Sequence, residues 1–178
     1  QMLIYLFCIA QNGRGKYANS IPAGILYMPA SEQTPSLSRD ATDEETKKAY
    51  LDHYRMNGLL LQDDEVLNAM EEGIKGVFIP IATKKDGNFT SASLNALISL
   101  KELGKVNRYI QKLITNMADE LHHGHVEAEP IDDVCRFCQY AGVCGVNPAD
   151  AMREYVKYDK QAALEYMEKE IREEERDG

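Results

Sequence analysis

The sequence of 178 residues predicts a helix-rich α/β fold. Two capping boxes, in which a Ser/Thr and a Glu three residues later bond reciprocally at a helix start, occur at 42–45 and 99–102. Short apolar runs at 23–29 and 77–81 are typical of β-strands. The segment 135–144 adds three cysteines at metal-ligand spacing, which predicts a metal centre.

The predicted helices are expected to cover most of the chain. Residues 1–10 place Leu3, Leu6 and Phe7 on one buried face. The helix that starts at Ser99 is the longest, and a hydrophobic staple of Ile98 with Leu103 should fix its entry. Further helices are expected from Asp43 to Arg55 with a stop at Gly58, after the cap Asp63 with an end at Gly73, and from Asn147-Pro148 onward. One apolar stripe is expected to be buried, and it consists of Val106, Ile110, Leu113, Met117 and Leu121. Leu164, Met167 and Ile171 are apolar positions on an otherwise charged last helix, and the tail from Glu168 is expected to be solvated or frayed.

The two predicted strands differ in pattern. Ala23 to Pro29 is a short apolar run preceded by Pro22, as expected of a buried or edge strand. Residues 77–81 alternate apolar and other side chains, and the turn residues 85–87 should fold this strand back through Phe89 as a hairpin.

Charge and the chain ends limit the possible functions. A net charge of −9 would repel a phosphate backbone if it were spread evenly, which argues against an autonomous nucleic-acid-binding protein. The apolar run Met2 to Ala10 follows no basic region and is too short to span a bilayer, so neither a signal peptide nor a membrane anchor is expected.

Because Gln1 lies within a helix-like segment, we expect a carboxy-terminal piece of a longer protein. A reducing cytoplasm is the expected location.

Cys135, Cys138 and Cys144 are the main candidate site. Two thiolates separated by two residues can reach one metal across a tight turn, and a third six positions later can close over it. Phe137 and Tyr140 would then shield the centre from water. Three ligands leave one position open. Buried structural thiols or a redox-active pair are the alternatives that the spacing allows.

The remaining polar candidates have structural explanations. Gln1 and Tyr5 share a helix face at i and i+4, as a polar surface residue and a core tyrosine also could. Histidines at the predicted helix end near 122–125 are favoured by the helix dipole. The acidic pairs at 63–64 and 132–133 fit caps and solvated loops better than a magnesium site.

Four blocks of the sequence together resemble the end of the AddB family, the B subunits of bacterial ATP-dependent helicase/nucleases. The resemblance covers essentially the whole chain, and the block from Met56 to Val66 is more specific than the cysteines, which other iron–sulfur nucleases share. In order, the blocks are Gln1-Met-Leu-Ile-Tyr5-Leu, Ala23-Gly-Ile-Leu-Tyr27, Met56-Asn-Gly-Leu-Leu-Leu-Gln-Asp-Asp-Glu-Val66 and the C-x2-C-x5-C segment 135–144.

The resemblance implies the C-terminal, helix-rich part of a restriction-endonuclease-like α/β nuclease domain with an iron–sulfur staple. Such PD-(D/E)xK nucleases place an Asp and a D-x-K element on a central sheet, where Mg²⁺ activates water against a DNA phosphodiester. A Q-x-x-x-Y motif on the next helix supports that site, and Gln1 and Tyr5 match it. The chain would start just after the catalytic acids and lysine, so on its own it is expected to be inactive.

The resemblance also assigns the cysteines. Cys135, Cys138 and Cys144 match the last three of four ligands to a 4Fe-4S cluster, and the first ligand lies far upstream in the family. Cys8 does not match and is expected to be a core cysteine. Residues 1–146 would form the C-terminal portion of the nuclease domain, and 147–178 a helical tail.

By resemblance, the longer protein unwinds and degrades duplex DNA ends during double-strand-break repair by recombination. It would be one half of an ATP-binding, cytoplasmic heterodimer with an AddA-like helicase/nuclease subunit, with Mg²⁺ at the exonuclease site. A Cas4-like or RecB-like iron–sulfur exonuclease is one alternative, although the Met56 block tells against it. A non-catalytic zinc-binding interaction module is the other.

Overall fold

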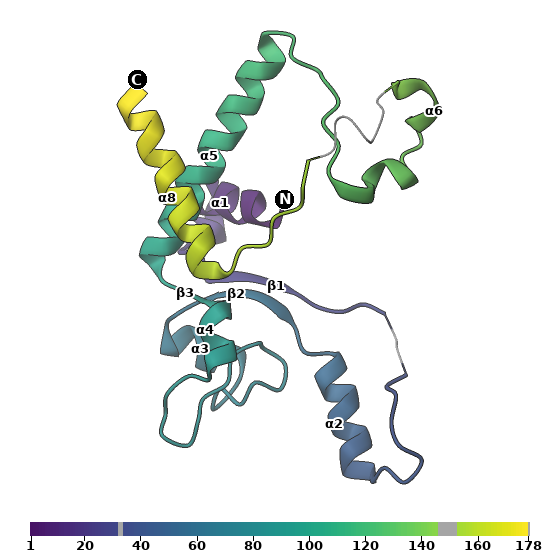
Figure 1. Ribbon diagram of the computed structural model, residues 1–178. Helices are drawn as coiled ribbons and strands as arrows, with labels where there is room; N and C mark the ends of the chain where they lie inside the picture. Colours follow the sequence, from purple (N-terminus) through teal and green to yellow (C-terminus); the bar gives the residue numbers. More distant parts are fainter. Residues whose placement is uncertain (32–33, 146–152, 178) are drawn as a thin grey trace. The chain divides into compact units, whose positions relative to one another are not determined.

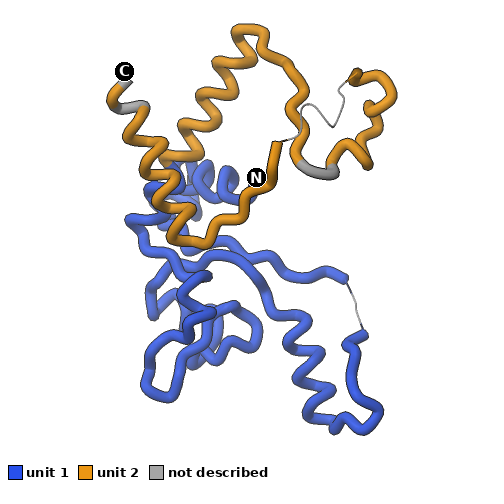
Figure 2. The backbone as a smooth tube through the Cα atoms, viewed as in Figure 1, with its two compact units in different colours: residues 1–107 blue, residues 108–178 orange. Residues whose placement is uncertain are grey.

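The computed structural model describes residues 1–31, 34–145 and 153–177 (Figure 1). The chain forms two compact units, residues 1–107 and 108–178, which are described separately below (Figure 2). Within the described residues, no helix is long and apolar enough to cross a membrane. The predicted helix start at Asn147-Pro148 and the predicted boundary at residue 146 lie outside the described residues.

The first unit is built on a three-stranded sheet with the order β1-β2-β3 (Figure 1). The central strand β2 pairs antiparallel with β1 and parallel with β3, so the sheet is mixed. The run 23–29 therefore forms an edge strand, as predicted. The strands are β1 (Gly24–Tyr27), β2 (Asn57–Leu61) and β3 (Leu97–Ile98).

Two glycines allow β1 and β2 to approach closely. Gly24 has φ of 133° and Gly58 has φ of 153°, a region that disfavours residues with a Cβ. A Cβ at Gly58 would lie 2.0 Å from the Ile25 carbonyl oxygen, and one at Gly24 would lie 2.2 Å from that of Leu59. Gly58 thus belongs to a strand, and the prediction that it stops the preceding helix is wrong.

The core of the first unit lies around β2. Leu60 is fully buried, and the Ser93 hydroxyl is enclosed beside the core. That hydroxyl accepts a hydrogen bond from the Ala82 N–H at 2.8 Å and donates one to the Ala82 carbonyl at 3.1 Å, which satisfies a buried polar group. The core cluster comprises Leu60, Leu67, Ile74, Ile79, Ile81 and Leu97.

Helix starts in the first unit follow their caps. The Thr42 hydroxyl accepts from the Glu45 N–H, and the Glu45 carboxylate accepts from the Thr42 N–H at 2.8 Å, which is the predicted capping box. Asp63 accepts from two backbone N–H groups at the start of the next helix, as predicted. The helices are α1 (Met2–Asn12), η1 (Gly15–Tyr17), α2 (Asp43–His53), α3 (Asp64–Met70) and α4 (Ser91–Ala96).

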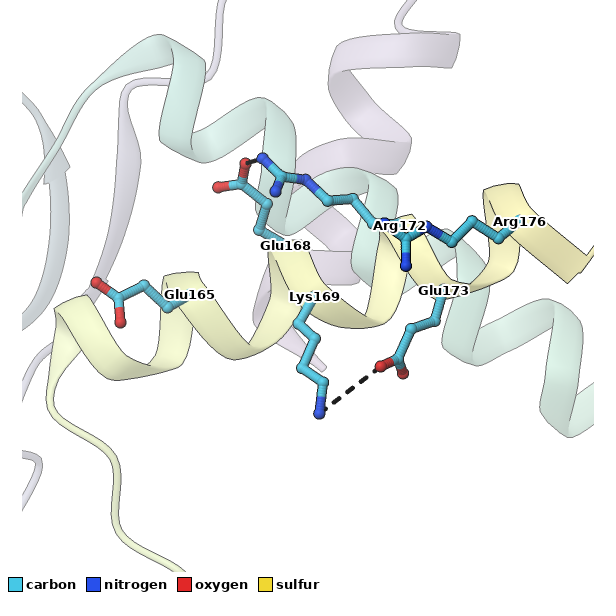
Figure 3. Close-up of a pocket in the computed structure, with 6 residues that line it drawn as sticks. All are labelled: Glu165, Glu168, Lys169, Arg172, Glu173 and Arg176. Carbon is cyan, nitrogen blue, oxygen red and sulfur yellow. Dashed lines mark hydrogen bonds and ion pairs between the residues drawn. The ribbon is translucent and has the colours of Figure 1, made fainter.

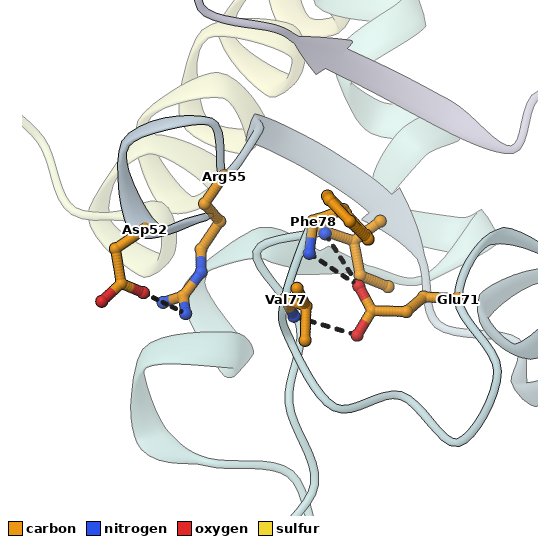
Figure 4. Close-up of polar contacts among 6 residues, drawn as sticks. Asp52, Arg55, Glu71, Val77 and Phe78 are labelled. Atoms are coloured by element: carbon orange, nitrogen blue, oxygen red, sulfur yellow. Dashed lines mark hydrogen bonds and ion pairs between the residues drawn. The ribbon is translucent and has the colours of Figure 1, made fainter. Parts of the chain in front are cut away.

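The predicted strand at 77–81 does not form. The Glu71 carboxylate accepts hydrogen bonds from the backbone N–H groups of Val77 at 2.9 Å, Phe78 at 2.8 Å and Ile79 at 3.1 Å (Figure 4). Glu71 thereby takes the place of a neighbouring strand. The turn expected after the strand is present, since the Gly87 N–H donates to the Lys84 carbonyl at 3.0 Å.

The predicted capping box at 99–102 starts the longest helix, α5 (Leu100–His122). The Ser99 N–H donates to the Glu102 carboxylate at 2.7 Å, and the Glu102 N–H donates to the Ser99 hydroxyl at 3.2 Å. Of the stripe predicted to be buried, Val106 is buried, but Met117 and Leu121 are 66% and 68% exposed. The apolar residues recur along the whole of α5, but those in its second half are exposed. The prediction of a buried stripe therefore holds only for the first half of the helix.

In the second unit, α8 (Lys160–Asp177) packs against the later part of α5. The Tyr109 and Tyr166 rings meet edge to face at 6.2 Å, and the Lys112 ammonium donates to the Glu170 carbonyl. Of the apolar positions of this charged helix, Leu164 is buried, and Met167 and Ile171 are partly buried. Burial raises the pKa of Tyr109 above its ordinary value, with the neighbouring Tyr166 adding to the shift. Two short helices, η2 (Asp132–Phe137) and α6 (Ala141–Cys144), contain Cys135 and Cys144, and Cys138 directly follows η2.

Candidate metal centre

Cys135, Cys138 and Cys144 line one cavity of about 340 Å³ in the second unit. Cys135 lies in η2, Cys138 follows it directly, and Cys144 ends α6. Only Cys135 lies within the 3₁₀-helix, so the fold of the whole segment 135–144, and not a single helical period, brings the three thiols to one cavity. The rest of the lining is Ala128, Glu129, Pro130 and Val134.

Arg153 contacts the residues that precede the cysteine-bearing segment. The Arg153 backbone N–H donates to the Pro130 carbonyl at 2.8 Å, and the Arg153 guanidinium forms an ion pair with Glu129. A parallel bridge pairs Ile131 with Arg153. No sequence motif marks Arg153, because a pairing across more than twenty residues leaves no local pattern. Arg153 holds together the two ends of the segment that carries the thiols.

The donor set of the cavity fits a thiolate-ligated centre of more than one metal atom. Among the described residues, no three His, Cys, Asp or Glu side chains converge closely enough to hold a single metal ion. The three thiols nevertheless line one cavity, and a 4Fe-4S cluster separates its ligands by a whole cube. Cys135 is half-buried, while Cys138 and Cys144 are exposed, so exogenous groups can reach the site.

Phe137 and Tyr140 do not shield this cavity. Their side chains are 86% and 62% exposed, which corrects the prediction that they cover the centre. Phe137 is the last residue of η2 and Tyr140 directly precedes α6, and neither residue lines the cavity.

Gln1 and Tyr5 form a second candidate site at the start of α1. The Gln1 side-chain amide donates to the Tyr5 hydroxyl at 2.8 Å, so the two side chains meet as their spacing predicts. The Tyr5 ring is 51% exposed and is not a core tyrosine. Phe7 is the buried residue of this helix. The pair is therefore presented on the surface of the first unit, where it could contact a further group.

Cys8 is exposed, which corrects the prediction of a core cysteine. Consecutive residues of an α-helix point about 100° apart, so burying Phe7 turns Cys8 outward. Cys8 also lies outside the unit that contains the other three thiols. It is therefore a natural reference thiol for tests of the cysteine-lined cavity.

The sequence contains a single (D/E)-x-K match, Glu45-Thr46-Lys47. It lies in helix α2 and not in the sheet. Hydrogen bonds from the Thr42 backbone and hydroxyl hold the pKa of the Glu45 carboxyl below its ordinary value. Because this carboxylate caps the helix, the match is structural and does not supply a catalytic metal site.

A solvent-facing hollow of about 440 Å³ along α8 is lined by charged side chains of one helix (Figure 3). Lys169 pairs with Glu173 at 3.6 Å, and Arg172 pairs with Glu168 at 2.5 Å. These are ordinary i, i+4 pairs of an exposed helix face. This hollow adds no chemistry to the site.

Comparison with known proteins places these features in context. A sequence profile described as the PD-(D/E)XK nuclease superfamily matches residues 1–145. The chain is 29% identical over 150 residues to the B subunit of the ATP-dependent helicase/deoxyribonuclease of Thermoanaerobacter sp. (strain X514). It is 28% identical over 151 residues to the protein of the same name from Acetivibrio thermocellus. Each match covers 81% of the chain and 13% of the relative, so the chain spans a small part of these proteins.

Proposed function

The chain belongs to the PD-(D/E)XK nuclease superfamily, and on this basis we propose that it forms part of the B subunit of an ATP-dependent helicase/deoxyribonuclease. The observation that carries the proposal is the match of 81% of the chain to subunits of that name. In this proposal the complex unwinds and degrades duplex DNA ends in the cytoplasm, during double-strand-break repair by recombination. Its other subunit is an AddA-like helicase/nuclease.

The chain supports phosphodiester hydrolysis and does not itself perform it. A nuclease of this class needs carboxylates and a lysine around Mg²⁺, and the one (D/E)-x-K match here is a helix cap. The relatives are several times longer, which leaves room for those groups elsewhere. The exposed Gln1–Tyr5 pair would orient the lysine or the scissile strand. We expect the chain alone to show no Mg²⁺-dependent nuclease activity.

The thiols of Cys135, Cys138 and Cys144 would hold three corners of a 4Fe-4S cluster, with the fourth ligand from outside the chain. The shared cavity and the spacing of three and six residues support this part of the proposal. A bound cluster supplies a cross-link between distant parts of the protein. The chain contributes the thiolates and, through the Arg153 contacts, keeps the segment closed around them. Without the fourth ligand the cluster should be labile.

Nuclease assays on the full-length subunit, purified with its helicase partner, test the proposal. Linear duplex DNA with ATP and Mg²⁺ should be degraded by the wild type and by Cys8→Ala, whose thiol is exposed and remote in sequence. Cys138→Ala should lose its iron, and its binding of DNA ends should fall. A wild-type complex that neither unwinds nor degrades DNA would overturn the proposed function.

A zinc-binding interaction module is the second candidate, because the C-x2-C spacing of Cys135 and Cys138 is also that of zinc sites. Metal analysis of anaerobically purified protein separates the two. Brown protein containing iron and acid-labile sulfide supports the cluster, whereas colourless protein with one zinc per chain supports the module.

A further inference from the structure

The Gln1–Tyr5 pair lies on an exposed side of α1 that runs the length of the helix. Residues three or four positions apart share one side of an α-helix, so this side continues from Tyr5 toward the end of α1. Phe7 points to a different side and is buried. The residues of the exposed side are all accessible to solvent, and they are Gln1, Tyr5, Cys8 and Asn12.

The loop that follows α1, residues 13–17 and here called the basic loop, has a fixed shape. The Gly13 N–H donates to the Ile9 carbonyl at 2.8 Å, which ties the loop to the end of the helix. The Tyr17 N–H donates to the Arg14 carbonyl at 3.2 Å. A Cβ at Gly13 would lie 2.3 Å from the Tyr17 carbonyl oxygen, so only glycine allows this turn. The side chains of the basic loop are therefore presented at a defined place beside α1.

The basic loop carries two cations, Arg14 and Lys16, and both are exposed. The Lys16 ammonium lies 4.9 Å from the centroid of the Tyr17 ring, a cation–π contact that favours one position of the ammonium. Elsewhere in the chain, cations such as Arg55 and Lys112 pair with carboxylates. Among the described residues, no carboxylate forms an ion pair with either cation of the basic loop. Their charge is available to an anion from outside.

The surroundings of the basic loop in the sequence contain no acid. All 29 acidic residues of the chain lie after residue 31, and no other acid-free run is longer than 16 residues. Residues 1–31 carry a charge of +2, and the total of −9 leaves −11 for the rest of the chain. Strand β1, against which α1 packs, belongs to the same acid-free run. A polyanion is repelled by most of such a chain and can approach along this segment.

We propose that Arg14 and Lys16 bind phosphates of the DNA strand whose cleavage the Gln1–Tyr5 pair supports. The inference rests on the proposed function and deepens it by adding a substrate-binding site. Helix α1 has 11 residues and rises about 1.5 Å per residue, so the basic loop lies about 16 Å from Gln1. Phosphates of one strand advance about 3.4 Å per nucleotide. The phosphates bound by the basic loop are therefore about five nucleotides from the cut.

The first test replaces both cations, as Arg14→Gln/Lys16→Gln, in the full-length subunit assembled with its helicase partner. The KM of the nuclease for linear duplex DNA should rise by about 5- to 30-fold, as for the loss of two exposed ion pairs. The slope of log KM against log salt concentration should fall by about 1–2, because fewer counterions are released. The kcat should stay within twofold of wild type, since the Gln1–Tyr5 hydrogen bond is untouched.

Lys84→Gln/Lys85→Gln is the matched control. These two lysines are also adjacent, exposed and located in a turn of the first unit, but Asp86 follows them. The control removes the same charge as the double variant of the basic loop, and it should change neither the KM nor its salt dependence.

Tyr17 provides a test that removes no charge. Tyr17→Leu deletes the ring beside the Lys16 ammonium and should raise the KM by about 2- to 5-fold, the range for an exposed cation–π contact. Tyr17→Phe retains the ring and should behave as wild type. Thermal melting should be the same for both variants, because the side chain of Tyr17 is half-exposed.

The position of the contact is tested with DNA ends in which a single phosphate is replaced by an uncharged methylphosphonate, one position at a time. The wild-type complex should cut most slowly when the uncharged group lies about five nucleotides from the cut. Arg14→Gln/Lys16→Gln should be insensitive to that position, because the contact that the substitution removes is already absent.

A double variant of the basic loop with the KM and salt dependence of wild type would overturn the proposal, as would an equal effect of the Lys84/Lys85 control. Weakened assembly with the helicase subunit at unchanged KM would overturn it too and would identify the loop as a protein-docking surface. The proposed function fails separately, if the wild-type complex does not process DNA ends.

Discussion

Glu71 shows how one side chain can take the place of a neighbouring strand. Three consecutive backbone N–H groups donate to its carboxylate. Partial burial opposes ionisation of Glu71, but these hydrogen bonds outweigh it and lower the pKa of the carboxyl from its ordinary value of 4.5. Because the folded pKa lies below the unfolded one, ionised Glu71 stabilises the fold above about pH 4.5, and this stabilisation is lost as the pH falls through the folded pKa.

Glu71→Gln should therefore lower the free energy of unfolding at pH 7 by about 1–2 kcal/mol, the range for charged hydrogen bonds reduced for solvent screening. The difference from wild type should shrink when the pH is lowered from 7 to well below 4.5, through the folded pKa of Glu71. Urea unfolding at the two pH values measures it. Glu72→Gln is the control, since that side chain is exposed and should give no such difference. A deficit of equal size at both pH values would show that the charge of Glu71 is not responsible.

Gln1→Ala should reduce nuclease turnover of the complete helicase/nuclease by about 10- to 100-fold, as expected when a reacting group is misplaced. Helicase activity and folding should stay nearly unchanged, because the Gln1–Tyr5 hydrogen bond lies on an exposed helix face. Strand unwinding and DNA degradation measured on one preparation decide this. Parallel loss of unwinding would count against the assignment of Gln1 to the nuclease site.

At the scale of secondary structure, the sequence predicts helix starts well and strands poorly. The caps at Thr42, Asp63 and Ser99 each open a helix, because a cap depends on residues at most three positions apart. Strand β2 is not predicted by the pattern, since Leu59-Leu60-Leu61 shows no alternation. The segment 77–81 alternates apolar and other side chains, but its backbone N–H groups bond to the Glu71 carboxylate and not to a strand. Glu71 lies six to eight positions earlier in the sequence, and no local pattern reveals this contact.

The close contact of β1 with β2 gives a prediction about glycine. Gly58→Ala should destabilise the chain by about 1–3 kcal/mol, because the backbone at φ of 153° is strained for alanine and its Cβ would collide with the Ile25 carbonyl. Gly104→Ala is the matched control. It lies in helix α5 with open space around the new Cβ, so it should be neutral or slightly stabilising. Thermal melting distinguishes the two, and equal effects would contradict the close-approach explanation.

At the scale of the whole molecule, the cysteine spacing predicts that the three thiols share a site. The contacts around that site could not be predicted from the sequence. The three thiols line one cavity although they lie in η2, directly after it and at the end of α6. Phe137 and Tyr140 are exposed, although their place between the ligands suggests a shielding role. Closure by Arg153 depends on a distant pairing. A cluster held here would cross-link distant parts of the full-length subunit.

The central claim is that Cys135, Cys138 and Cys144 together hold an iron–sulfur cluster, and its most direct test is iron and sulfide content per chain. In the anaerobically purified full-length subunit we expect about four of each, as a 4Fe-4S cluster requires. Cys138→Ala should abolish both and lower the melting temperature, while Cys8→Ala should keep both. The 178-residue chain alone should retain much less. Stoichiometric zinc in place of iron, or iron that survives Cys138→Ala, would contradict the account.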